Sequence, residues 1–311
     1  FVNIFVPVTF QNKTNLLING GGNADAITLD NPNPGTGLAF IQVDGGDGAD
    51  SISVLDTTPG AGLHLVGGAG NDTFTIADGV AIDDGVAGST AAIEGGAGID
   101  TLNLSALQTS LTVRLISNSA DGYTGSESTG GVLPLDLFTG IDSIIGSASG
   151  AADAILGLDF ASTWEIDGTN QYTDNMTGRS IGIENFEDLT GGIFADTFQL
   201  STVHTGNLAG GAGDDAFAFL TDNAAVTGGI EAGSGDDTID FSGITASDVT
   251  VTLDGAGTNG GPMGTGFSGL VAVVATGFID VNNLVGGGGG NDTLIGLDSD
   301  ANWELLIAGF R

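Results

Sequence analysis

The chain has 311 residues and a formal net charge of −35, with four Lys and Arg side chains against 39 Asp and Glu. This charge excludes a protein that binds nucleic acid or an anionic membrane through a basic surface, and the absence of cysteine excludes disulfides and thiolate metal sites. Glycine contributes 56 residues, yet 41% of the chain is hydrophobic, and no apolar run approaches the length of a membrane-spanning helix, so we expect neither a disordered linker nor membrane insertion.

The first predicted element is a strand at residues 1–10, FVNIFVPVTF, which are apolar, β-branched or aromatic. Proline lacks the N–H group that a sheet interior needs, so Pro7 predicts an edge strand or a bulge. We expect this strand to fold onto its own domain, and pairing with another subunit is the alternative.

One short motif then recurs about nine times, a glycine-rich turn that ends in aspartate, as in Gly67–Asp72. The aspartates are Asp25, Asp50, Asp72, Asp100, Asp153, Asp196, Asp215, Asp237 and Asp292. Two positions after each stands a large apolar residue, in order Ile27, Ile52, Phe74, Leu102, Ile155, Phe198, Phe217, Ile239 and Leu294. A small residue separates them, and this alternation predicts a strand with one buried face.

The spacing of the motif predicts the architecture. Its aspartates follow one another at similar intervals in two arrays, the first from Leu16 to Leu104 and the second from Gly191 to Phe241. Such intervals fit coils of a parallel β-solenoid with the glycine-rich turns stacked on one side, whereas helices would need less glycine. Because a repeat array shares one core, we predict that residues 1–311 form one continuous all-β solenoid with coils of roughly 19–28 residues.

A longer repeat overlies the coil repeat, with an offset of about 137–139 residues. Its matching segments are Ile93–Leu102 with Ile230–Ile239, Leu111–Leu115 with Val249–Leu253, and Trp164 with Trp303. The two copies cover about residues 93–229 and 230–311, the second being shorter, and each contains a long stretch between motifs, Asn103–Ser149 or Asp240–Gly286. We expect the tryptophans to pack in the core rather than to bind a ligand.

The long repeat also suggests a partner. Residues 11–25 loosely resemble residues 183–196, which follow Trp164 in the first copy. The beginning of the sequence therefore looks like what should follow residue 311. Either the chain is a segment of a longer array, or copies stack head to tail through unpaired strand edges into a filament.

The motif resembles the hemolysin-type calcium-binding repeat, the RTX nonapeptide Gly-Gly-x-Gly-x-Asp-x-U-x, in which U is large and apolar. Five copies match its first six positions, at residues 45–50, 67–72, 95–100, 210–215 and 287–292. The resemblance implies a parallel β-roll or β-helix with Ca²⁺ between stacked turns, held by aspartates and turn carbonyls. RTX domains repeat every nine residues, whereas here one motif falls in each coil, as in glycine- and aspartate-rich arrays of bacterial surface and fibre proteins.

The chemistry of calcium favours the same ligands, because a hard cation takes six to eight oxygens and stacked turns lie about 4.8 Å apart. We predict that the metal ligands come from Asp25, Asp47, Asp50, Asp72, Asp100, Asp214, Asp215, Asp236, Asp237 and Asp292. The alternative is that glycine and aspartate only form good turns, with each carboxylate bonded to nearby backbone and no metal in the stack.

The function that we predict is structural, not enzymatic: a calcium-binding repeat protein of a bacterial surface layer, stalk or filament, located outside the cell. An adhesin module that binds a surface or a carbohydrate is the first alternative, although Tyr123 and Tyr172 are the only tyrosines. A polysaccharide-active β-helix enzyme is the second. The two histidines, His64 and His204, stand far apart in the sequence among small or apolar neighbours, so we expect no catalytic role for them.

Overall fold

The computed structural model of the protein describes residues 13–30, 37–56, 61–80, 82, 92–127, 137–150, 152–261 and 264–297. Throughout these segments the chain forms strands and turns without a helix, which confirms the predicted all-β class. The described residues accordingly contain no helix able to span a membrane. The strand predicted at residues 1–10 and the position of Trp303 lie outside them.

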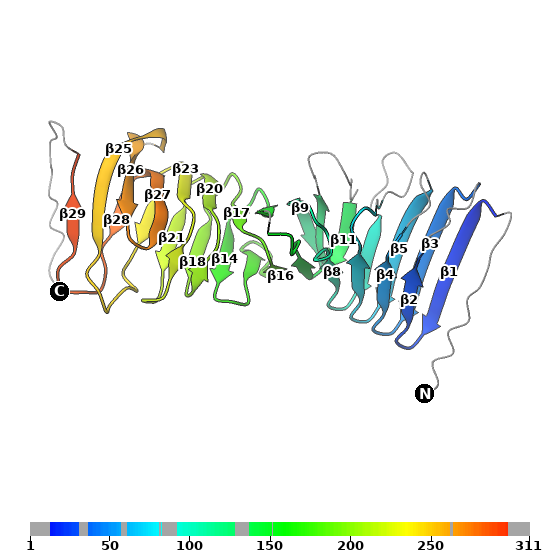
Figure 1. Ribbon diagram of the computed structural model, residues 1–311. Helices are drawn as coiled ribbons and strands as arrows, with labels where there is room; N and C mark the ends of the chain where they lie inside the picture. The colour runs from blue at the N-terminus through cyan, green and yellow to red at the C-terminus, as the bar shows by residue number, and fades with distance from the viewer. Residues whose placement is uncertain are drawn as a thin grey trace. The chain divides into compact units, whose positions relative to one another are not determined.

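The chain divides into two compact units (Figure 1). Unit 1 comprises Phe1–Leu158, Gln171–Thr173 and Thr177–Phe186, and unit 2 comprises Asp159–Asn170, Asp174–Met176 and Glu187–Arg311. In Figure 1 the blue and cyan strands belong to unit 1, and the yellow and orange strands belong to unit 2. A single continuous core through residues 1–311 stays a prediction.

In unit 1 the strands contribute to two sheets, and the first eight strands alternate between them. One sheet contains β1 (Asn15–Gly22), β3 (Phe40–Asp47), β5 (Gly62–Ala69), β7 (Ile93–Ala97), β9 (Thr112–Ser119), β10 (Gly122–Glu127), β11 (Leu137–Ile141) and β13 (Ala154–Leu156). The other contains β2 (Ala26–Leu29), β4 (Ser51–Val54), β6 (Thr73–Ile76), β8 (Thr101–Asn103), β12 (Ser143–Ile145), β15 (Gln171–Asp174) and β16 (Arg179–Glu184).

The parallel pairing in unit 1 places equivalent motif residues on top of one another. In the first sheet Val43 of β3 lies opposite Ile18 of β1 and Leu65 of β5. In the second sheet the stacked residues are, in order, Ile27, Ile52, Phe74, Leu102, Ile144 and Ile183. The apolar residues after the first four motif aspartates therefore form one stack, which Ile144 and Ile183 continue, whereas Ile155 after Asp153 lies in the other sheet opposite Val113.

Unit 2 has the same two-sheet arrangement. Its first sheet contains β17 (Asp188–Thr190), β19 (Val203–His204), β20 (Leu208–Ala212), β22 (Ala225–Val226), β23 (Ile230–Ser234), β25 (Thr250–Gly261), β26 (Gly264–Val271), β27 (Val274–Val281) and β29 (Thr293–Ile295). Its second sheet contains β14 (Ser162–Ile166), β18 (Thr197–Leu200), β21 (Ala216–Phe219), β24 (Thr238–Asp240) and β28 (Asn283–Val285).

An aromatic stack forms the core of unit 2. Trp164, Phe198 and Phe217 occupy one register position on β14, β18 and β21. The rings of Trp164 and Phe198 are 5.6 Å apart and 4° from parallel, and those of Phe198 and Phe217 are 4.8 Å apart and 9° from parallel. All three side chains are fully buried, so Trp164 is a core residue.

The two long stretches between motifs interrupt the parallel pairing. In unit 1, β10 pairs antiparallel with both β9 and β11, and β11 then joins β7 in parallel with Phe138 opposite Ile93. In unit 2, β26 pairs antiparallel with both β25 and β27, and β27 joins β23 with Phe278 opposite Ile230. The same strand order and pairing thus recur in the two segments that the long repeat relates.

The alternation predicted after each aspartate matches the observed burial over most of the chain. Seven of the nine apolar residues at this position are fully buried, and the exceptions are Ile27 of β2, which is partly exposed, and Leu294 of β29, which is 49% exposed. Within the described residues these two strands pair on one side only, β2 with β4 and β29 with β25.

Candidate functional site

The motif aspartates end the turns that connect the two sheets, and most are buried. Asp50, Asp72 and Asp100 stand between β3 and β4, β5 and β6, and β7 and β8, each with at most 2% of its surface exposed. Asp215 and Asp237 occupy the same place in unit 2 and are equally buried. A buried carboxylate is costly unless its oxygens are bonded or its charge is compensated, so these residues are the first candidates for a site.

Each of these carboxylates accepts a hydrogen bond from the backbone of the preceding motif aspartate. The backbone N–H of Asp25 donates to Asp50 Oδ1, that of Asp50 to Asp72 Oδ1 and that of Asp72 to Asp100 Oδ1, each at 2.7 Å. In unit 2 Asp196 donates to Asp215 and Asp215 to Asp237, both at 2.8 Å.

We call these two series the aspartate ladders. The unit 1 ladder consists of Asp25, Asp50, Asp72, Asp100 and Asp142, and the unit 2 ladder of Asp196, Asp215, Asp237 and Asn282. Side chain to backbone bonds of this kind tie each coil to the next, in addition to the pairing of the strands.

The second carboxylate oxygen has no such partner. The Oδ2 atoms of Asp25, Asp50, Asp72, Asp100, Asp215 and Asp237 are buried without a hydrogen bond. Five of them lie beside the first motif glycine, and Asp237 is the exception because Ala232 stands at that position. A Cβ added at Gly67 would collide with Asp72 Oδ2 and would lie 2.5 Å from the carbonyl oxygen of Gly95. The first glycine therefore makes room for the carboxylate, whereas Gly68 and Gly70 have φ values of 108° and 137° that favour glycine directly.

Burial changes the proton affinity of these groups. Burial raises the pKa of Asp215 to about 8 and those of Asp100 and Asp237 to about 6, and it also raises the pKa of Asp72. Neighbouring carboxylates add to the effect, since Asp196, Asp237 and Asp214 all raise the pKa of Asp215. The unit 2 ladder consequently holds a proton or needs a cation near neutral pH.

Of the ten predicted ligands, six belong to the ladders: Asp25, Asp50, Asp72, Asp100, Asp215 and Asp237. Asp47 and Asp214 are exposed, and the backbone N–H of Asp236 donates to Asp214 Oδ1 at 2.9 Å. Asp292 is exposed. Its Oδ1 accepts the backbone N–H of Val249 at 2.8 Å, as the Oδ1 of a ladder aspartate accepts the N–H of another aspartate.

Sequence reasoning missed the residues that end each ladder. Asp142 accepts the backbone N–H of Asp100 at 3.0 Å, and Asn282 accepts that of Asp237 at 3.2 Å. No glycine-rich turn precedes Asp142, so the first half of the motif is absent there. The second half of the motif was nevertheless present, because Asp142 is followed by a small and then a large apolar residue, Ser143 and Ile144.

The fit to a metal ion depends on the unbonded oxygens. Within the described residues no three Asp, Glu, His or Cys side chains converge on one point. Each coil supplies one buried carboxylate, and its Oδ1 already accepts a backbone N–H. A Ca²⁺ ion would therefore need Oδ2 atoms together with glycine carbonyl oxygens, such as that of Gly95 beside Gly67, to reach six ligands.

Comparison of the whole chain with protein-family models and with curated proteins finds no match.

Proposed function

We propose that the protein is a structural repeat protein, built as a parallel β-solenoid and used outside the cell in a surface layer, stalk or filament. The observation that carries this proposal is the register: coil after coil, the motif aspartate of one level bonds to the backbone of the level before it. Such a repeated arrangement suits a scaffold, because each coil contacts its neighbours and the array can extend.

Calcium is the second part of the proposal. The buried Oδ2 atoms of Asp215 and Asp237, with Asp214 and Asp236 close enough to raise their pKa values further, supply the negative charge that a divalent cation would neutralise. Ca²⁺ tolerates irregular oxygen geometry, as carbonyls and carboxylates of adjacent turns would provide. Binding to the folded state alone would stabilise it by mass action.

Thermal unfolding of the full chain, in chelator and in calcium, tests this part. We expect calcium to raise the unfolding midpoint of the wild type and to do so much less in Asp215→Asn, which removes a buried charge from the unit 2 ladder. Glu165→Gln is the matched control, because it removes one charge from an exposed position of β14 in the same unit. Its response to calcium should equal that of the wild type.

Two results would contradict calcium binding. A midpoint indifferent to chelator and calcium would leave the aspartates as turn and ladder residues only. An equal loss of response in Asp215→Asn and Glu165→Gln would show that calcium acts on the overall charge and not at the ladder.

Self-association through strand edges is the third part. Within the described residues β1 pairs in register with β3 and β29 with β25, and both expose apolar side chains, Leu17 at 64% and Leu294 at 49%. Edge strands of this kind can accept a strand of a second copy. Sedimentation and negative-stain imaging should show assemblies that Leu294→Lys disrupts and that Leu220→Lys, at an exposed position directly after β21, leaves intact. Monomers of the wild type under all calcium conditions would exclude this partner.

A further inference from the structure

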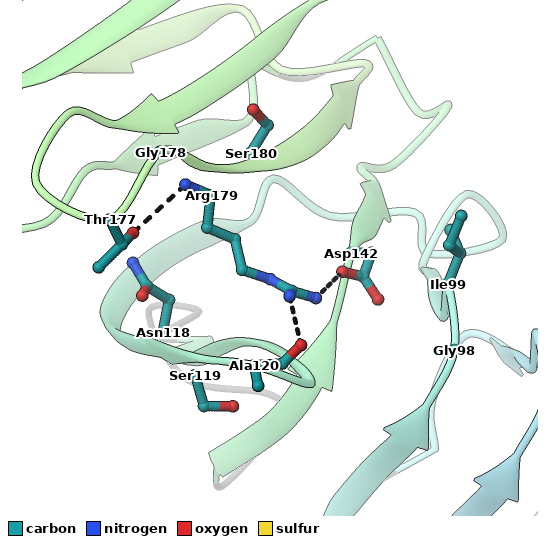
Figure 2. A pocket seen from close by; sticks show the side chains of 10 residues that line it. All are labelled: Gly98, Ile99, Asn118, Ser119, Ala120, Asp142, Thr177, Gly178, Arg179 and Ser180. Carbon is teal, nitrogen blue, oxygen red and sulfur yellow. Dashed lines mark hydrogen bonds and ion pairs between the residues drawn. The ribbon is translucent and has the colours of Figure 1, made fainter.

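Arg179 joins three separate segments of unit 1. It begins β16, and its guanidinium pairs with the carboxylate of Asp142 and donates to the backbone carbonyl of Ala120 in the turn between β9 and β10 (Figure 2). Its own carbonyl accepts a hydrogen bond from the Tyr123 hydroxyl at 2.6 Å. The guanidinium therefore links the hairpin, the ladder and β16 in one polar cluster.

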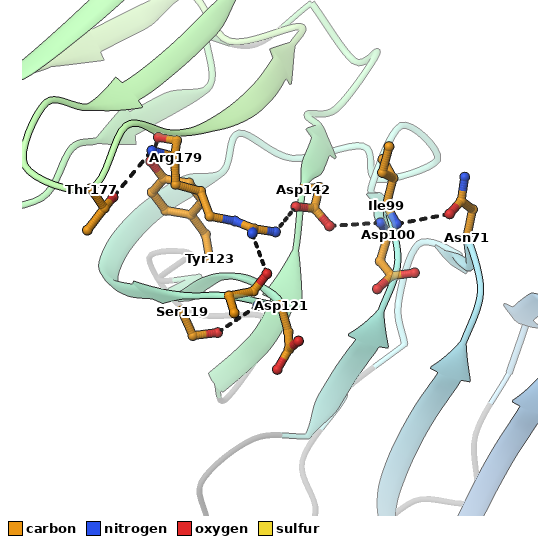
Figure 3. Close-up of polar contacts among 10 residues, drawn as sticks. Asn71, Ile99, Asp100, Ser119, Asp121, Tyr123, Asp142, Thr177 and Arg179 are labelled. Carbon is orange, nitrogen blue, oxygen red and sulfur yellow. Dashed lines mark hydrogen bonds and ion pairs between the residues drawn. The ribbon is translucent and has the colours of Figure 1, made fainter.

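Asp142 belongs to this cluster and to the unit 1 ladder at the same time. Its Oδ2 accepts the backbone N–H of Asp100 at 3.0 Å, and its Oδ1 is the atom that Arg179 binds (Figure 3). Both oxygens of Asp142 are thus used, in contrast to Asp72 and Asp100, whose Oδ2 atoms are buried without a hydrogen bond. Asp142 also raises the pKa of Asp100 after the larger effect of burial, so its charge acts on the ladder.

Unit 2 has a neutral residue at the equivalent place. Ser143 pairs with Thr101 in unit 1, as Asn283 pairs with Thr238 in unit 2, which makes Asn282 the equivalent of Asp142. The Asn282 Oδ1 accepts the backbone N–H of Asp237 at 3.2 Å. An amide needs no counter-charge to accept this bond, whereas a carboxylate beside another carboxylate does.

We propose that Arg179 is a built-in counter-ion that ends the unit 1 aspartate ladder, and that Asn282 ends the unit 2 ladder without charge. The arginine compensates the carboxylate that continues the ladder past Asp100, and it holds the β9–β10 turn against that carboxylate. This inference deepens the proposed structural function and rests on it only in the stacking of coils through the ladder. It requires no metal ion.

The surroundings of the pair favour a fixed charge. Arg179 and Asp142 line an open surface pocket of about 780 Å³ together with polar groups that include Asn118 and Ser180. The side chains of the pair are only 23% and 11% exposed. Water screens a pair of this burial incompletely, so removal of Arg179 leaves the Asp142 carboxylate uncompensated. Replacement of Asp142 by the amide leaves the more exposed Arg179 with its bond to the Ala120 carbonyl.

A double-mutant cycle measured by hydrogen exchange tests the proposal in the full chain. Arg179→Met should speed exchange of the β8 and β12 amides about tenfold, since a charge-assisted bond to a partly buried carboxylate is lost. Asp142→Asn should change these rates less than about threefold, because the amide keeps the acceptor for Asp100 as Asn282 does for Asp237. Arg179→Met added to Asp142→Asn should then have little further effect. The β21 amides of unit 2 serve as the reference in every variant.

Arg179→Lys and Asn282→Asp complete the test. Lysine keeps the charge, so exchange should stay closer to the wild type than to Arg179→Met. Asn282→Asp places a carboxylate at the end of the unit 2 ladder without an arginine and should speed exchange of β24 and β28. The proposal would be overturned if Arg179→Met changed the exchange rates equally in the wild type and in Asp142→Asn. It would also be overturned if Asn282→Asp left the exchange rates of β24 and β28 unchanged.

The experiment separates this inference from the calcium proposal. The cycle is run in chelator, where no divalent cation takes part. If the double-mutant cycle shows the expected coupling and calcium does not raise the unfolding midpoint, the Arg179 proposal holds and the calcium proposal fails. If the cycle shows no coupling and calcium raises the midpoint, the calcium proposal holds and the Arg179 proposal fails.

Discussion

At the residue scale, the carboxylate of a buried ladder aspartate such as Asp72 is bonded through one oxygen and buried at the other. Asp72 Oδ1 joins its coil to the previous one, and its burial leaves Oδ2 without a hydrogen bond. The first glycine of the motif permits this arrangement by leaving space for the carboxylate, as Gly67 does for Asp72. Where the Gly-Gly-x-Gly-x-Asp pattern is complete, its first glycine and its aspartate therefore pack against each other, whereas Ala232 stands at this position before Asp237.

Gly67→Ala tests this dependence. A Cβ at this position collides with Asp72 Oδ2 and approaches the Gly95 carbonyl, so we expect a loss of roughly 2 kcal/mol in the free energy of unfolding, the usual scale of overpacking. Gly22→Ala is the control, because nothing lies within 4 Å of its added Cβ and the residue is exposed. Chemical denaturation should show a shift for Gly67→Ala alone, and equal shifts in both variants would contradict the packing role.

The raised pKa values predict how stability changes with pH in chelator. Asp100 and Asp237, with pKa values of about 6, and Asp215, with a pKa of about 8, bind protons more tightly folded than unfolded, where the usual value is near 4. The folded state then holds more protons between pH 4 and pH 8, so stability falls as pH rises through this window. We expect the unfolding midpoint at pH 5 to exceed that at pH 8 by about 5 °C.

Asp215→Asn provides the check on this pH profile. It removes the group with the highest pKa, so the decline between pH 6 and pH 8 should flatten while the decline below pH 6 remains. Glu165→Gln, exposed on β14, should leave the profile unchanged. A wild-type profile that rises from pH 5 to pH 8 would show that the ladder carboxylates are compensated in the metal-free protein.

At the element scale, the sequence predicted the strands well and the hairpins poorly. Period-2 alternation after each aspartate identified strands such as Thr73–Ile76, because that signal depends only on which face is buried. The antiparallel strands β9, β10 and β11 fall in the long stretch between motifs, where the motif pattern predicts no strand. A turn signal was present at Asp121-Gly122, where Gly122 has a φ of 137°, but pairing of distant strands cannot be derived from local periodicity.

The ladder shows the same limit for the site. The sequence located the aspartates and their turns, since glycine spacing determines both. It could not show that Oδ1 of Asp50 bonds to the backbone of Asp25, a contact across 25 residues that depends on the stacking register. It also gave no reason to connect Asp142 with Arg179, which are 37 residues apart and belong to different elements.

The aromatic stack of unit 2 predicts how its core responds to substitution. Phe198 lies between Trp164 and Phe217, so Phe198→Leu removes two ring contacts and should cost about 1–2 kcal/mol of stability. The environment of Trp164 changes as well, and its fluorescence should shift. Phe160→Leu, at a 41% exposed ring that stacks on Phe194 near the surface, should cost under about 0.5 kcal/mol. Equal costs would mean that the stack adds nothing beyond apolar burial.

At the scale of the whole molecule, two kinds of negative charge oppose folding. Exposed acids such as Asp47, Asp214 and Glu231 contribute one part of the net charge of −35, and monovalent salt screens them because the Debye length at 0.1 M is about 10 Å. The buried Oδ2 atoms of the ladders are shielded from salt by the surrounding protein. Sodium chloride and calcium should therefore act on different parts of the charge.

Unfolding at matched ionic strength separates the two effects. In chelator, sodium chloride between 20 and 200 mM, an interval chosen around the roughly 0.1 M screening range, should raise the midpoint by a few degrees through the exposed acids. Calcium chloride at the same ionic strength should raise it further, because an ion at the ladder also compensates buried carboxylates. Magnesium serves as the control cation, since it holds its water more firmly and prefers regular octahedral sites. Equal midpoints in calcium and magnesium would assign the whole effect to screening, and the ladders would then hold protons instead of metal.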